Sequence, residues 1–113
     1  LDTTWLWFHA ALDSARARVT AQQGRGLVID LHGHAHEVPR LELGYLIDDA
    51  ELRLTNSALE AAGALTRSSV ARLATDSRVA TDRGAAILRG SNSLGALLVA
   101  AGYASVPSPA DPA

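Results

Sequence analysis

A short apolar run, LVIDL at residues 27–31, is the feature that most constrains the fold of this chain. It follows Gly26, contains the β-branched residues Val28 and Ile29, and is too short for a typical helix. A run of this kind is typical of a strand that is buried on both faces, as in a parallel sheet. We therefore predict a strand here, whose C-terminal end leads directly into His32.

Apolar periodicity and capping residues predict helices on both sides of this strand. The first helix begins at Asp2 or Thr3 as its N-cap and ends at Gly24. The other expected elements are helices at 56–62, 67–75, 82–89 and from Asn92 or Ser93 to Gly102, with strands at 41–47 and 103–106. This order predicts an α/β fold, a mixed and mostly parallel sheet flanked by helices.

The length of 113 residues suits one domain. We expect a single α/β domain over residues 1–113, or a fragment of a longer domain. The second alternative follows from the two ends, since the chain begins without methionine and stops in the proline-rich segment VPSPADPA.

The composition excludes several classes of site. The chain has no cysteine, so a metal must take imidazole, carboxylate or water ligands, and zinc or another divalent ion is the expected cofactor. All ten basic residues are arginines, and they are dispersed along the chain rather than gathered in a basic patch, so we expect no nucleic-acid partner. No apolar run approaches the ~20 residues that span a bilayer, so we expect no membrane partner. The sequence does not determine the compartment, and a cytoplasmic location is a guess.

Three of the four histidines lie within five positions, in the segment DLHGHAHE at residues 30–37. Side chains alternate along a strand, so Asp30, His32, His34 and His36 point the same way for as long as the backbone stays extended. Ligands of α/β proteins gather at the carboxyl ends of strands. We therefore predict that the three histidines bind a metal and that Asp30 accepts a hydrogen bond from His32. The alternative for His34 and His36 is a loop position that faces solvent.

A second polar segment, RLELGY at residues 40–45, follows Pro39. Arg40 is a candidate anchor for a substrate carboxylate, because a guanidinium binds a carboxylate with two hydrogen bonds. Glu42 is a candidate general base, and its alternative role is an ion pair with Arg40 on a sheet edge. Tyr45 is a candidate substrate-binding residue, and its alternative role is packing with the hydroxyl in water.

The segments LVIDLHGHAH at residues 27–36 and RLELGYL at residues 40–46 resemble the N-formylglutamate amidohydrolase family, which is similar to zinc carboxypeptidases and aspartoacylase-type deacylases. The later segments LRGSNSLGALL at residues 88–98, Gly102-Tyr103 and VPSP at residues 106–109 are also similar to members of this group. The resemblance covers most of residues 26–112.

The resemblance implies a zinc-carboxypeptidase-like fold and the metal-dependent hydrolysis of an amide. It implies a small substrate, an N-acyl amino acid such as N-formylglutamate or a related peptide. It also implies that His32 is the third zinc ligand, and that the other two ligands and the general base lie on segments that this chain lacks. The chain would then carry only part of the site, with Arg40 and Tyr45 on the substrate-facing wall.

Two alternatives stay open. One is a barrel amidohydrolase in which His32 and His34 form the pair on the first strand, although that fold needs about 250 residues. The other is an inactive fragment, or a small interaction domain that retains a histidine cluster. An exposed apolar seam on such a domain would favour homo-oligomerisation.

Overall fold

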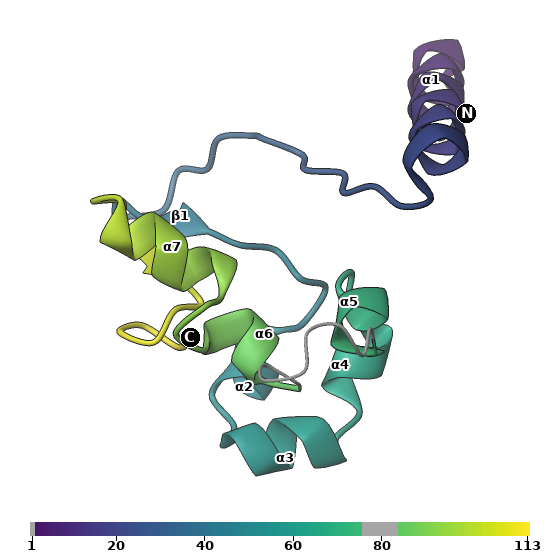
Figure 1. Ribbon diagram of the computed structural model, residues 1–113. Coiled ribbons are helices and arrows are strands. Elements are labelled where there is room, and N and C mark those ends of the chain that lie inside the picture. Colours follow the sequence, from purple (N-terminus) through teal and green to yellow (C-terminus); the bar gives the residue numbers. More distant parts are fainter. Residues whose placement is uncertain (1, 76–83) are drawn as a thin grey trace. The chain divides into compact units, whose positions relative to one another are not determined.

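The computed structural model describes residues 2–75 and 84–113 and divides the chain into two compact units, Leu1–Ala35 and His36–Ala113. The first unit holds one long helix, α1, at Thr3–Gln23, followed by a segment without regular structure (Figure 1). The elements of the second unit are β1 Leu41–Glu42, α2 Asp49–Leu52, α3 Asn56–Ala61, α4 Ala64–Arg67, α5 Ala71–Thr75, α6 Ala86–Arg89, α7 Leu94–Ala100 and β2 Ser105–Val106.

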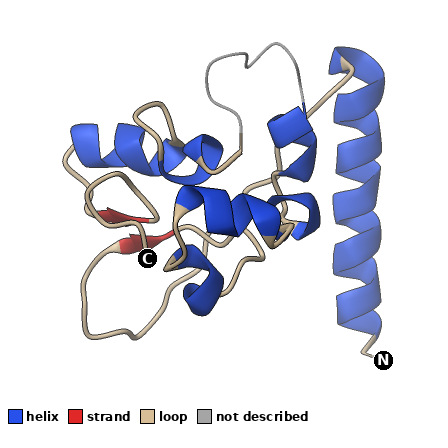
Figure 2. Ribbon diagram, turned by 90° about the horizontal axis from the view of Figure 1, so that it is seen from below, coloured by secondary structure: helices blue, strands red, loops and turns tan. Residues whose placement is uncertain are grey.

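The predicted α/β fold is wrong. In the described part of the chain the only sheet has two strands of two residues each, β1 and β2, which pair in parallel with Leu41 opposite Ser105 and Glu42 opposite Val106 (Figure 2). Helices form most of the remaining regular structure, so this is not a mixed sheet flanked by helices.

The strand predicted at residues 27–31 does not form, and this prediction is also wrong. The segment is irregular, and the side chain of Leu31 is 90% exposed. Val28 and Ile29 are exposed as well. A strand needs a partner for its backbone hydrogen bonds, and an apolar run supplies the surface for burial without supplying that partner.

Local signals located the helix ends more accurately. Asp2 caps α1 by accepting a hydrogen bond from the Thr4 amide, and α1 ends at Gly24, which takes a left-handed conformation with φ 73°. Ser93 caps α7 by accepting from the Ala96 amide. These N-cap bonds satisfy amides that have no partner inside the helix.

The other expected elements are shorter than predicted. The strand expected at 41–47 is confined to β1, and the one expected at 103–106 to β2. The helix expected at 67–75 is only α5, which begins at Ala71. Of the helix expected at 82–89, residues 82 and 83 lie outside the described part of the chain, and α6 covers Ala86–Arg89.

The hydrophobic core lies within the second unit and is built mainly of leucine and alanine. The buried cluster consists of Leu59, Ala64, Leu65, Ala85 and Leu88, with Tyr45, Ile47, Leu52 and Val70 packed against it. This core connects α3, α4 and α6 with the segment that follows β1. It therefore supports the chain directly after Glu42, which is a predicted site residue.

None of the helices in the described part of the chain is long and apolar enough to cross a membrane.

Candidate metal site at residues 34–42

The first histidine of the run is not among the residues that could hold a metal together in the described part of the chain. His32 Nδ1 is 3.6 Å from Asp30 Oδ2, and both side chains are more than three-quarters exposed. This distance is too long for the predicted hydrogen bond, and the two residues lie on an irregular exposed segment rather than at the end of a buried strand. The regular alternation that would direct all three histidines to one side is therefore absent.

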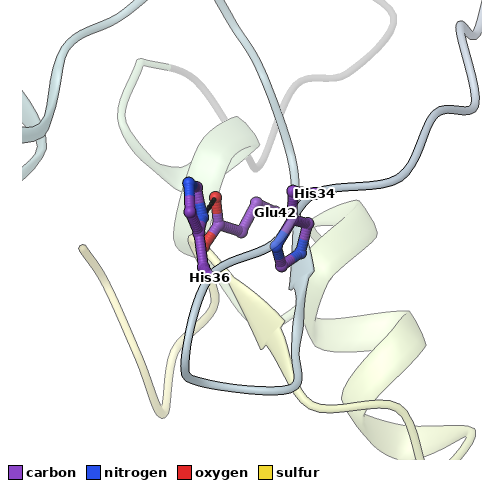
Figure 3. Close-up of side chains that lie close together, drawn as sticks. All are labelled: His34, His36 and Glu42. Atoms are coloured by element: carbon purple, nitrogen blue, oxygen red, sulfur yellow. Dashed lines mark ion pairs between the residues drawn. The ribbon is translucent and has the colours of Figure 1, made fainter.

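His34, His36 and Glu42 come together on one short stretch of chain (Figure 3). One potential ligand atom from each of the three residues lies within 4.8 Å of the others. The closest pair is His36 Nδ1 and Glu42 Oε2, at 2.8 Å. All three residues were predicted as site residues, and this cluster does not include His32.

The position of Glu42 is fixed by the backbone on both sides of it. The Leu41 amide donates to the Ala104 carbonyl at 2.8 Å, and the Leu43 amide donates to the Val106 carbonyl at 2.8 Å. A tight turn before β1, in which the Arg40 amide donates to the Val38 carbonyl at 3.0 Å, returns the chain toward the histidines. Strand pairing thus holds the carboxylate, while His34 and His36 lie on irregular backbone.

The three donors suit zinc. Imidazole nitrogen and carboxylate oxygen bind zinc at about 2.0–2.2 Å, which separates two ligands of a tetrahedral ion by about 3.3–3.6 Å. The described cluster therefore needs only small side-chain movements to reach this geometry.

Arg40 lies beside this cluster and connects it to the C-terminal segment. Its Nη1 donates to Asp111 Oδ2 at 2.6 Å, and its Nε lies 3.7 Å from Glu42 Oε1. Its side chain is only 25% exposed. The ion pair with Glu42 that the sequence offered as an alternative is present, and the guanidinium also has a carboxylate partner within the chain.

Tyr45 packs against the core rather than beside the histidines. Burial raises the pKa of its hydroxyl above the ordinary value. Its backbone carbonyl accepts a hydrogen bond from the Ser69 amide at 2.9 Å. This position favours the packing role that was the alternative to substrate binding.

An open pocket of about 590 Å³ lies elsewhere in the second unit. It is lined by Leu52, Arg53, Leu54, Thr55, Asn56, Arg89, Pro112 and Ala113. None of the predicted site residues lines it, so the pocket and the histidine cluster are separate features.

A second ion pair lies near Arg40. Arg53 donates two hydrogen bonds to Asp49, and these bonds are the main cause of the lowered pKa of Asp49 and the raised pKa of Arg53. Arg40 contributes a smaller lowering to Asp49, and Asp111 a smaller raising to Arg53. The side-chain carboxylate of Asp111 therefore belongs to a cluster in which Asp49 and Asp111 lie near Arg40 and Arg53.

Asp111 is the residue that sequence reasoning missed. It lies 71 positions from Arg40 in a proline-rich segment, and no local spacing connects the two. Only the parallel pairing of β1 with β2, which brings the C-terminal segment to Arg40, reveals this contact.

No protein-family model, curated protein or solved structure matches this chain. The resemblance to N-formylglutamate amidohydrolases therefore stays an expectation from the sequence.

Proposed function

We propose that residues 34–42 bind a divalent metal, zinc in the first place, and that this chain contributes the site to a metal-dependent amide hydrolase. The observation that carries the proposal is the convergence of two imidazoles and one carboxylate, His34, His36 and Glu42, within 4.8 Å. In a chain without cysteine, this is a donor set that zinc accepts.

The geometry favours a division of roles among the predicted residues. His34 and His36 supply ring nitrogens, and Glu42 supplies the third ligand through the oxygen that now contacts His36. His32 and Asp30 lie outside this ligand set, and a role for them in the site needs movement of an irregular segment.

The proposal of hydrolysis rests on the ligand count, because the resemblance assigns the ligand role to His32, which lies outside this ligand set. A bound zinc ion polarises a carbonyl oxygen and lowers the pKa of a bound water toward ~7. His34, His36 and Glu42 would hold that ion, which would supply this chemistry when bound. The substrate class, an N-acyl amino acid or a related peptide, is proposed on the resemblance.

Metal binding through His36 Nδ1 must also move a hydrogen. The 2.8 Å contact between His36 Nδ1 and Glu42 Oε2 needs one hydrogen between nitrogen and oxygen, and a metal in its place would send that hydrogen of a neutral imidazole to Nε2 without net release. A protonated imidazole or carboxyl group must lose its proton before it can bind, so zinc binding should weaken at low pH.

The test is zinc binding by the full chain, measured by competition with a chromophoric chelator. We expect one zinc per chain, with affinity reduced at least about tenfold in each of the variants His34→Ala, His36→Ala and Glu42→Gln. The matched control is His9→Ala, because His9 stacks on Trp5 in α1 with ring centroids 4.0 Å apart. Equal affinity in the wild type and all three ligand variants would refute the site.

A second candidate, a small interaction domain, is favoured by one observation. The apolar side chains of Leu27, Val28, Ile29 and Leu31 are exposed on the irregular segment that precedes the histidines. Exposed apolar stretches of this kind mark interaction surfaces. This function would take precedence if the wild-type chain bound no zinc in the competition experiment.

A further inference from the structure

Arg40 lies between two carboxylates of different function. One of them, Glu42, divides its two oxygens: Oε2 lies 2.8 Å from His36 Nδ1, and Oε1 lies 3.7 Å from Arg40 Nε. The other, Asp111, accepts a hydrogen bond from Arg40 Nη1 at 2.6 Å. These contacts form a continuous series of side chains, which runs from His36 through Glu42 and Arg40 to Asp111.

The C-terminal segment holds Asp111 in place through its own backbone. The Ser108 amide donates to the Asp111 carbonyl at 2.6 Å, and the Asp111 amide donates to Ser108 Oγ at 3.1 Å. Ser108 is fully buried and follows β2 closely, so the turn is attached to the strand that pairs with β1. The carboxylate of Asp111 is therefore preorganised beside Arg40.

A guanidinium beside a metal ligand opposes metal binding in two ways. Its positive charge repels the cation, and it competes for the carboxylate that the cation needs. Both effects are stronger for a side chain that is mostly shielded from water, as that of Arg40 is. A second carboxylate that neutralises the guanidinium reduces both effects.

We infer that Asp111 is a positioning residue for the metal site: by neutralising Arg40, it leaves the carboxylate of Glu42 available to the ion. The inference rests on the proposed metal site at residues 34–42. It also couples that site to the C-terminal segment, so that zinc binding and the docking of residues 105–111 stabilise each other. All of the residues that this inference uses belong to the second unit, except the ligand His34.

The experiment compares zinc affinities of four proteins, namely the wild type, Asp111→Asn, Arg40→Gln and the double variant. Asp111→Asn should bind zinc roughly tenfold more weakly. This is the lower end of the loss in metal affinity that follows when a residue supporting a metal ligand is mutated. Arg40→Gln should bind at least as tightly as the wild type. In the double variant, affinity should return to within about threefold of the wild type, because the opposing charge has been removed.

The matched control is Glu51→Gln, which changes the net charge equally and breaks another ion pair of this unit, that between Glu51 and Arg67. Its zinc affinity should equal that of the wild type. Hydrogen exchange of the Leu41 and Leu43 amides, which pair with the C-terminal segment, reports whether β1 and β2 stay together in each variant. We expect these amides to stay protected in Asp111→Asn and to gain protection when zinc is added to the wild type.

The outcomes separate the two proposals. If the wild type binds zinc and Asp111→Asn binds it equally well, the role of Asp111 is refuted and the site stands. If Asp111→Asn loses affinity and Arg40→Gln does not restore it, Asp111 is a structural residue only, and the inference is again refuted. If the wild type binds no zinc, the proposed site fails and the inference fails with it.

Discussion

The guanidinium of Arg89 makes hydrogen bonds that its position in the sequence does not predict. It donates to the carbonyl of Leu52, to the carbonyl of Leu54 at 2.6 Å and to Asn56 Oδ1 at 2.9 Å. These acceptors lie where the chain passes from α2 to α3, and carbonyls at a helix end have no partner within the helix. From the sequence alone, Arg89 is only a basic residue near the end of a short helix.

Tyr45 gives a prediction for the alkaline limit of stability. Burial raises the pKa of its hydroxyl in the folded state above the value of about 10 in the unfolded chain. The stability contributed by the protonated phenol is therefore fully present below pH ~10 and is lost as the pH rises through the folded pKa. The free energy of unfolding, measured with urea between pH 8 and 11, should fall above pH ~10.

Tyr45→Phe should reduce this alkaline fall, because the phenylalanine ring packs equally well and does not ionise. Tyr103→Phe is the control, since it changes an exposed tyrosine and keeps Tyr45. A fall of unchanged size in Tyr45→Phe would contradict the assignment.

Sequence reasoning at this scale succeeded where the signal is local. Asp2 and Ser93 were each one of two predicted N-caps, and a cap is predictable because it acts on an amide two or three residues away. His34 and His36 were named as candidate ligands for their crowding in a short segment, and Glu42 was named as a candidate general base in the segment after Pro39. The contact between Arg40 and Asp111 was out of reach, because it depends on two strands that are distant in the sequence.

At the scale of elements, the contrast lies between the predicted strand at 27–31 and the observed strand β2. The predicted strand had the stronger apolar pattern, yet it has no pairing partner in the structure. Ser105–Val106 has a weak pattern, but both residues are buried and pair with β1. Strand formation depends on the cross-strand partner and on packing more than on intrinsic preference, so the apolar run was a poor guide.

The contact of α7 with the segment after β2 gives a test at this scale. A Cβ atom added at Gly95 would lie 2.0 Å from the Pro107 carbonyl oxygen, closer than two such atoms can approach. Gly95→Ala should therefore lower the free energy of unfolding by about 1–3 kcal/mol, the usual cost of overpacking. In the interior of an exposed helix the same change would stabilise by up to about 1 kcal/mol, so the sign is diagnostic.

Gly44→Ala is the matched control, because a Cβ there meets no atom within 4 Å. Urea denaturation of the two variants beside the wild type measures both effects. A Gly95→Ala protein as stable as the wild type would show that α7 does not pack closely on this segment.

For the whole molecule, the distribution of buried side chains separates the two units. The buried hydrophobic residues belong to the second unit, with Leu59 and Leu88 fully buried. In the described part of the first unit no residue of α1 is buried, and Trp5 and Phe8 are exposed. The sequence predicted the helix α1 and its ends, but the structure buries none of its residues.

This distribution predicts unequal responses to truncation of leucine. Leu88→Ala should lower the free energy of unfolding by about 2–5 kcal/mol, since it leaves a cavity in the core. Leu31→Ala should have almost no effect, because its side chain is 90% exposed. Thermal and urea denaturation of the full chain measure both values, and similar losses in the two variants would contradict this placement of the core.

The parallel pairing of β1 with β2 can form only after β2 has been synthesised. Val106 is opposite Glu42 in the ladder and is made 64 residues later (106 − 42 = 64). At about 5–20 residues per second, the ribosome needs roughly 3–13 seconds to cover that interval. Throughout this time the nascent chain presents its histidines while the strand that fixes the neighbouring carboxylate is still unmade.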